Sequence, residues 1–123
     1  MQRLSWLAYL FGDVIGVLVF CAVGRRSHAE GLTIAGVAST AWPFLTGTAV
    51  GWLAARAWQR PTAVVPTGVV VWLSTVVIGM LLRKLSSAGV AASFVLVAAV
   101  VTAVLLLGWR AAVGLVLRRR AGV

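Results

Sequence analysis

The sequence predicts an all-α polytopic membrane protein, a four-helix bundle of transmembrane helices in one domain that covers residues 1–123. Hydrophobic residues make up 62% of the chain, and the mean hydropathy of +1.06 is far above that of soluble domains. A segment in lipid must satisfy its own backbone hydrogen bonds, and the alternating pattern of a membrane barrel is missing, so helices are expected. The four apolar segments lie at about 4–24, 32–55, 66–82 and 89–109.

The borders of the segments support this division. Arg3 and Arg25 enclose a first segment of 21 residues, which as a helix would be about 31 Å long and match a bilayer core. The third segment is short, and the prolines from Pro61 to Pro66 predict an irregular start. The basic tail, residues 110–123, suits a helical extension that lies at an anionic membrane surface.

The basic residues gather at the ends of the apolar segments, where they indicate topology and contact with anionic lipids rather than nucleic-acid binding. Seven lie on the side of both termini and four on the other, so we expect a multi-pass protein of the plasma membrane with cytoplasmic termini. The seven are Arg3, Arg56, Arg60, Arg110, Arg118, Arg119 and Arg120, and the four are Arg25, Arg26, Arg83 and Lys84.

The two halves of the chain resemble each other and are compatible with two repeated helical hairpins. Gly51-Trp52 recurs as Gly108-Trp109 at the end of the corresponding segment. Hairpins repeated in the same orientation occur in some transporters. Chance alignment of segments rich in alanine, valine and glycine is the alternative, and the second half has no counterpart of Asp13.

Asp13 is one of only two carboxylates in the chain and falls near the middle of the first segment. An ionisable residue inside a membrane is a functional-site candidate by default. Arg83 and Arg110 are expected about 12–15 Å from the midplane, so we expect no countercharge within reach and a carboxyl that takes up a proton. Asp13 would then either carry protons or act as a neutral hydrogen-bond donor between helices.

A break in the second helix is expected at Pro43, at about the depth of Asp13, because proline lacks an amide hydrogen and leaves a carbonyl free. Trp42, Trp72 and Thr75 are also central, so these residues are candidates, with Asp13, for binding a proton, a cation or a small solute. Core packing is the alternative for each of them. The other tryptophans lie near span ends and are expected to anchor at the membrane interface: Trp6, Trp52, Trp58 and Trp109.

Two Gly-x-x-x-Gly pairs predict close packing of helices. Gly12 and Gly16 flank the acid and would bring a neighbouring backbone towards Asp13. Gly47 and Gly51 form the second pair, in the second segment.

Arg25, Arg26, His28 and Arg83 are candidates for binding a lipid head group or another anion, and a solvated turn is the alternative. One histidine with one glutamate is too little for a metal site, and no catalytic or phosphate-binding motif occurs. No metal and no cofactor are therefore expected, and an enzyme is the weakest of the function classes. Cys21 is the only cysteine, which excludes an intrachain disulfide.

Several motifs together carry a resemblance to a known family. They are the acid in the first segment, the connection Gly-Arg-Arg-Ser-His-Ala-Glu-Gly at 24–31, Thr-Ala-Trp-Pro-Phe-Leu-x-Gly at 40–47, Gly-Trp at 51–52, and Trp-x-x-Thr-x-x-x-Gly-Met-x-x-Arg at 72–83. Over nearly the whole chain, this set resembles the uncharacterised small four-span prokaryotic membrane proteins called domain of unknown function three thousand and fifty-four. The resemblance implies the fold and the motif set, and it implies no activity.

A looser likeness is to small multidrug-resistance transporters, which are similar in length and span number and have an essential acid in the first span. Those proteins use glutamate, whereas this chain has Asp13, the proline at position 43 and an arginine-rich first connection. The departures weaken the expectation of cation export.

Two functions are consistent with the sequence. The first is a proton- or cation-coupled transporter of a small solute with an acidic site at the midplane. The alternative is a non-transporting membrane scaffold, or a subunit that binds anionic lipid or a partner. We expect a homo-oligomer, and for the transporter the reason is that a dimer would enclose more volume than four helices can.

Overall fold

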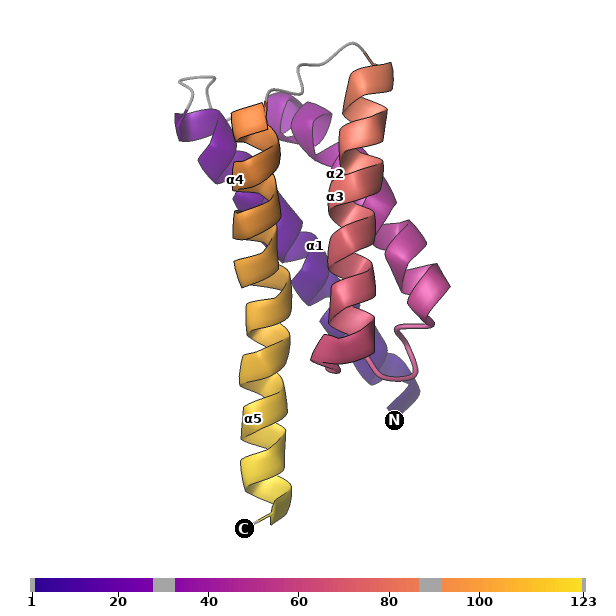
Figure 1. Ribbon diagram of the computed structural model, residues 1–123. Coiled ribbons are helices and arrows are strands. Elements are labelled where there is room, and N and C mark those ends of the chain that lie inside the picture. Colours follow the sequence, from indigo (N-terminus) through magenta and orange to yellow (C-terminus); the bar gives the residue numbers. More distant parts are fainter. Residues whose placement is uncertain (1, 28–32, 87–91, 123) are drawn as a thin grey trace.

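Four long helices pack side by side in the computed structural model, which describes residues 2–27, 33–86 and 92–122 (Figure 1). No strand occurs among these residues. The two ends of the chain lie at the same end of the bundle, and the last helix projects beyond the others there. The helices are α1 (Gln2–Ser27), α2 (Ile34–Ala55), α3 (Val69–Leu85), α4 (Ala92–Thr102) and α5 (Gly108–Gly122), with a π-helical turn, Ala103–Leu107, that joins α4 to α5.

Three helical stretches are long and apolar enough to cross a membrane, which indicates a membrane protein. They are Trp6–Gly24, Val64–Leu85 and Ala92–Arg120. Helix α2 has 22 residues but is not among them. It contains several hydroxyl-bearing residues, glycines and Pro43, which lower its hydropathy. The helical bundle is thus observed, while the fourth predicted span is not shown.

The helix boundaries differ from the predicted segments mainly at the basic ends. Helix α1 continues past Gly24 through Arg25 and Arg26, and the chain from Ala92 runs without a break into α5 as far as Gly122. Arginine and alanine are good helix formers, so the charged ends extend the helices instead of ending them. The basic tail, residues 110–123, was predicted as a helical extension, and as far as Gly122 it is part of α5.

Helix α2 contacts α3 more closely than it contacts α1. A Cβ atom built on Gly47 would lie 2.5 Å from the Ser74 carbonyl oxygen, and one on Gly51 would lie 2.8 Å from the Val71 Cα. The Ser74 hydroxyl donates to the Gly47 carbonyl at 2.6 Å, and the Thr48 and Thr75 hydroxyls are 2.7 Å apart. Glycine at these two positions lets the backbones touch.

Pro43 does not break α2. The helix is continuous from Ile34 to Ala55, and the proline is buried inside it. Next to it, the Phe44 ring packs edge-on against Phe20 of α1, with ring centroids 5.4 Å apart. Pro43 therefore lies at the level of Phe20, about 10 Å along α1 from Asp13 at the usual helical rise. The predicted common depth of the proline and the acid is wrong.

The segment between α2 and α3 brings one backbone carbonyl to α5. Helix α2 ends at Arg56, whose φ of 49° is left-handed and directs its N–H back to the carbonyls of Trp52 and Leu53. The chain then turns towards the start of α3, which is irregular as the prolines predict, since Val65 has extended φ and ψ angles. This path places Pro61 beside α5, where its carbonyl oxygen accepts a hydrogen bond.

The seam between α2 and α3 generates a stability prediction. Gly47→Ala forces a methyl group against backbone atoms and should destabilise the protein by about 1–3 kcal/mol. Gly108→Ala is the matched control, because a Cβ there meets no atom within 4 Å. Thermal unfolding in detergent, followed by circular dichroism, should show a lower midpoint for Gly47→Ala only. Equal midpoints for the two variants would contradict this account of the seam.

Candidate functional site

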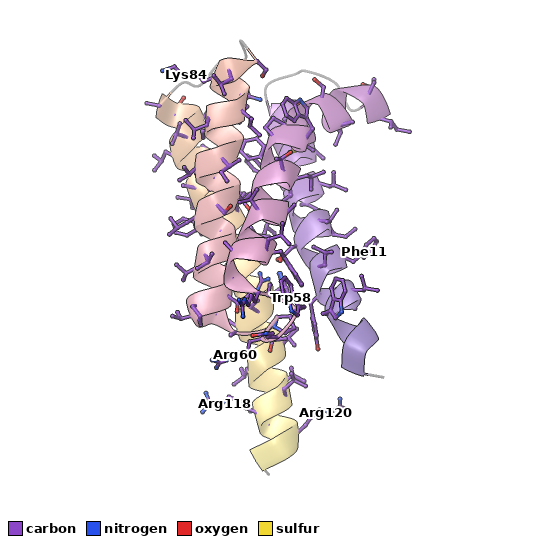
Figure 2. All side chains as sticks on the ribbon, turned by 90° about the vertical axis from the view of Figure 1, so that its right-hand side faces the viewer. Phe11, Trp58, Arg60, Lys84, Arg118 and Arg120 are labelled. Atoms are coloured by element: carbon purple, nitrogen blue, oxygen red, sulfur yellow. The ribbon has the colours of Figure 1, made fainter. Side chains whose placement is uncertain are left out.

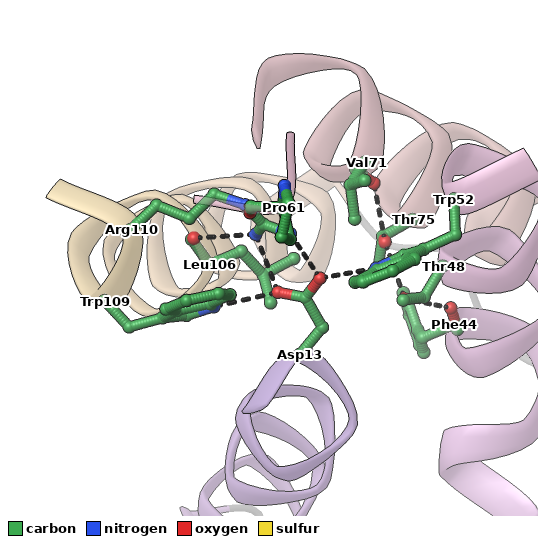
Figure 3. A network of polar contacts seen from close by, with 10 residues as sticks. All are labelled: Asp13, Phe44, Thr48, Trp52, Pro61, Val71, Thr75, Leu106, Trp109 and Arg110. Carbon is green, nitrogen blue, oxygen red and sulfur yellow. Dashed lines mark hydrogen bonds and ion pairs between the residues drawn. The ribbon is translucent and has the colours of Figure 1, made fainter. Parts of the chain in front are cut away.

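Asp13 and Arg110 form a buried ion pair between α1 and α5 (Figure 3). Arg110 Nη2 donates to Asp13 Oδ2 at 2.6 Å, and Nη1 donates to Oδ1 at 2.7 Å. Both side chains are 0% exposed. This is a two-pronged arginine–carboxylate contact, the geometry that gives such pairs both strength and a fixed orientation.

Two tryptophans complete the hydrogen bonding of the carboxylate. Trp52 Nε1 of α2 donates to Oδ2 at 2.7 Å, and Trp109 Nε1 of α5 donates to Oδ1 at 2.8 Å. These are the tryptophans of the two repeated Gly-Trp motifs, which meet at Asp13. The prediction that Trp52 and Trp109 are interfacial anchors is wrong, because the indole N–H groups point into the bundle.

Arg110 also holds two backbone carbonyls. Its Nε donates to the Pro61 oxygen at 2.8 Å, and Nη1 donates to the Leu106 oxygen at 3.1 Å. The guanidinium carbon lies 4.5 Å from the centre of the Trp109 ring, as in a cation–π contact. One side chain thus joins α1, α5 and the segment before α3.

Aromatic rings cover the ion pair from the α1 side. Trp6 packs against Trp52 with ring centroids 6.2 Å apart, and Tyr9 stacks on Trp109 at 5.7 Å. Rings that exclude water lower the local dielectric, so each hydrogen bond to the carboxylate is electrostatically stronger than in water.

The π-helical turn aligns Arg110 with the buried face of α4. Ala98, Thr102, Leu106 and Arg110 follow one another at intervals of four residues, and all are 0% exposed. In a regular α-helix, Ala98 and Arg110 would lie roughly 120° apart around the axis. A π turn accommodates one extra residue, which takes up about 100° and brings the two side chains back to one face.

The prediction that Asp13 has no countercharge within reach is wrong, and side-chain direction explains why. In a helix, Cα–Cβ bonds lean towards the N-terminus. Helices α1 and α5 run in opposite directions (Figure 1), so Asp13 and Arg110 lean towards each other. Depths estimated from backbone positions alone overstate their separation. The premise of a lone acid that must take up a proton is thereby removed.

The other candidates for a proton or solute site do not gather at Asp13. Trp42 is 46% exposed, and Pro43 lies at the level of the Phe20 ring. Trp72 Nε1 donates to the Ala99 carbonyl at 3.0 Å, which links α3 to α4. The Thr75 hydroxyl contacts Thr48 and donates to the Val71 carbonyl at 2.7 Å. These candidates are therefore divided among separate places in the bundle.

The head-group candidates are described only in part. The guanidinium carbon of Arg83 lies 4.5 Å from the centre of the Phe94 ring. His28 and the side chains of Arg25 and Arg26 fall outside what the structure describes.

The first glycine pair packs against side chains and not against a backbone. A Cβ on Gly12 would lie 3.8 Å from the Trp109 ring, and one on Gly16 would lie 3.3 Å from a Leu106 methyl group. The expected close backbone approach beside Asp13 is wrong, because these two large side chains occupy the space. Gly12 instead faces the Trp109 indole that donates to Asp13, at a distance where a Cβ would make ordinary contact.

The polar groups of the site are all engaged. Within the described ranges, no buried side-chain nitrogen or oxygen lacks a hydrogen-bond partner, and no group of three or more metal-ligating residues occurs. Arg110, Trp52 and Trp109 were not predicted from the sequence to contact Asp13. The signal that could have found the tryptophans was their recurrence in the two halves of the chain.

Comparison with known proteins yields one family. A family model described as "Protein of unknown function (DUF3054)" matches residues 10–113. The match covers most of the chain and leaves out residues 1–9 and 114–123. No curated protein and no solved structure matches the chain.

The ion pair generates a prediction about coupling. Arg110→Met leaves a buried carboxylate without its cation and should cost about 3–5 kcal/mol of stability. The double variant Asp13→Leu/Arg110→Met removes both charges and should unfold at a higher temperature than Arg110→Met alone. Arg119→Met changes an exposed arginine of α5 and serves as the control. Additive losses in the double variant, measured by thermal unfolding, would show that the two charges are not coupled.

The π turn generates a prediction about residue number. Deleting Val104 lets this turn close as a regular α-helix and keeps Arg110 on the buried face, so the loss of stability should be small. Deleting Val100, which lies in the regular part of the helix, rotates α4 by about 100° relative to Arg110. Both valines are exposed, so neither deletion removes a core side chain. A thermal midpoint as low for the Val104 deletion as for the Val100 deletion would contradict the role assigned to the turn.

Proposed function

We propose that the chain, which belongs to the DUF3054 family of proteins of unknown function, is a non-transporting integral membrane scaffold that binds anionic lipid or a partner protein. The observation that carries this proposal is the closed hydrogen bonding of Asp13. Its carboxylate accepts four hydrogen bonds, two from Arg110 and one each from Trp52 and Trp109, and is 0% exposed.

A transporter would need an acid that exchanges partners with water or substrate during its cycle. Each oxygen of Asp13 is already paired with one indole and one guanidinium nitrogen. Removing either partner of a buried ion pair is strongly unfavourable, so opening this site would cost several kcal/mol without a replacement ligand. The pair therefore suits a permanent clamp that fixes how α1, α2 and α5 pack.

The distribution of exposed charge supports lipid or partner binding. Arg60, Arg118 and Arg120 lie at the end of the bundle that holds both termini, and Lys84 lies at the opposite end (Figure 2). In a four-span arrangement, the more basic end would face the cytoplasm of the plasma membrane. Basic side chains at that surface attract anionic lipid head groups.

The outer face of α2 supports self-association of the scaffold. Its exposed residues follow the alternating three- and four-residue spacing of a helix-pairing seam. Small and hydroxyl-bearing side chains are favoured where membrane helices meet and gain less from contact with lipid. A second copy paired along this face would also account for the modest hydropathy of α2. The residues are Ser39, Trp42, Thr46, Ala49 and Leu53.

The proposal is tested by measuring flux and stability in the same variants. Purified protein in sealed liposomes should give no solute-driven proton movement above that of empty liposomes, across a panel of organic cations and anions. Asp13→Asn should leave this baseline unchanged, yet should lower stability by about 3–5 kcal/mol, because it leaves the Arg110 charge buried and uncompensated.

Gly47→Ala controls for loss of stability away from the ion pair. Proton movement that occurs in the unmodified protein and in Gly47→Ala, but is abolished in Asp13→Asn, would overturn the scaffold proposal in favour of transport.

A further inference from the structure

A groove of about 430 Å³ lies between α5 and the segment that precedes α3. Thr62 and Val64 form one wall. The other wall consists of Ala111, Gly114, Leu115 and Arg118, with Arg110 also in the lining. Its volume is in the range of small-molecule binding sites, about 300–1,000 Å³.

We infer that this groove binds one anionic phospholipid, with the head-group phosphate at Arg118 and the start of an acyl chain along Gly114 and Leu115. The inference rests on the proposed lipid-binding function and assigns it a place and a lipid class. The sequence predicted head-group contacts at Arg83 and its neighbours. The groove lies at the opposite end of the bundle.

The wall formed by α5 has one polar and one apolar part. Ala111, Gly114, Leu115 and Arg118 are spaced by three and four residues, so they lie on one face of the helix. Gly114 creates the hollow, since a Cβ there would meet no atom within 4 Å. An apolar trough that ends in an exposed arginine is complementary to an amphiphile with a negative head group.

The charge of Arg118 is available to a ligand. Arg110, the other arginine in the lining, is bound to Asp13 and two carbonyls. Among the described residues the only acid is Asp13, so no described carboxylate competes for Arg118. Arg119 and Arg120 follow it and keep the local field positive.

The depth of the groove fits the lipid head-group region. The helical stretch Ala92–Arg120 has 29 residues and is therefore about 43 Å long, while the hydrocarbon core is about 30 Å thick. The last part of α5 must extend beyond the hydrocarbon, and it projects past the other helices (Figure 1). Leu115 and Arg118 are thus expected near the boundary between the hydrocarbon core and the lipid phosphates.

The experiment measures lipid retention by the full chain. Protein extracted from vesicles of equal parts phosphatidylglycerol and phosphatidylcholine is analysed by native mass spectrometry. The unmodified protein should retain one phosphatidylglycerol in preference to phosphatidylcholine. Gly114→Leu fills the hollow, and Arg118→Gln removes the cation. Each should reduce retention by about fivefold or more, the effect of one basic contact near a lipid surface.

The matched controls change the same residue types outside the groove. Gly108→Leu places a side chain at another open helical glycine, and Arg119→Gln removes a neighbouring exposed arginine. Both should retain the lipid. Equal losses in Arg118→Gln and Arg119→Gln would mean unspecific attraction to a basic helix end, and unchanged retention in Gly114→Leu would overturn the groove site. Displacement of the lipid by inorganic phosphate alone would show that the apolar trough does not contribute, which also overturns the inference.

The two proposals fail in different ways. Flux that depends on Asp13 removes the scaffold function whatever the groove holds. If the groove variants retain the lipid and no proton flux is found, the groove inference fails. The scaffold proposal then remains, with its lipid contacts at other positions.

Discussion

The Asp13 carboxylate is buried among apolar helices because a guanidinium and two indoles complete its hydrogen bonds. A buried charge is costly unless it is paired and hydrogen-bonded on every side, so this requirement constrains the surrounding chain. The turn after α2 must place the Pro61 carbonyl under Arg110, and the π turn must direct Arg110 inward. Helix α1 must lie close enough to α5 for Asp13 to reach both Arg110 and Trp109. Four separate parts of the chain are thereby fixed relative to one another.

Much of the fold followed from hydropathy, whereas the site did not. Apolar length predicted the long helices, and the prolines predicted the irregular start of α3. The pairing of Asp13 with Arg110 was missed for two physical reasons. Residue depths were estimated from backbone rise, although side chains on antiparallel helices lean towards each other over several ångströms. In addition, Ala103–Leu107 contains only apolar residues, and composition gives no sign that their turn is π-helical.

The low hydropathy of α2 has a structural cause that the sequence pattern did not separate from a binding role. Gly47, Thr48 and Gly51 face α3, where glycine allows backbone contact and the threonine hydroxyl pairs with Thr75. Polar and small residues in an apolar helix are equally compatible with a buried binding site and with a close contact between two helices. Only the positions of their partners distinguish the two, and here the partners are helix atoms. This also explains why the hydroxyl of Thr75, a candidate for the site at Asp13, is engaged elsewhere.

The two oxygens of Asp13 have the same surroundings, since each receives one indole N–H and one guanidinium N–H. One indole comes from each half of the chain, at the same place in the repeated Gly-Trp motif. The carboxylate therefore stands where the two halves meet and is shared between them.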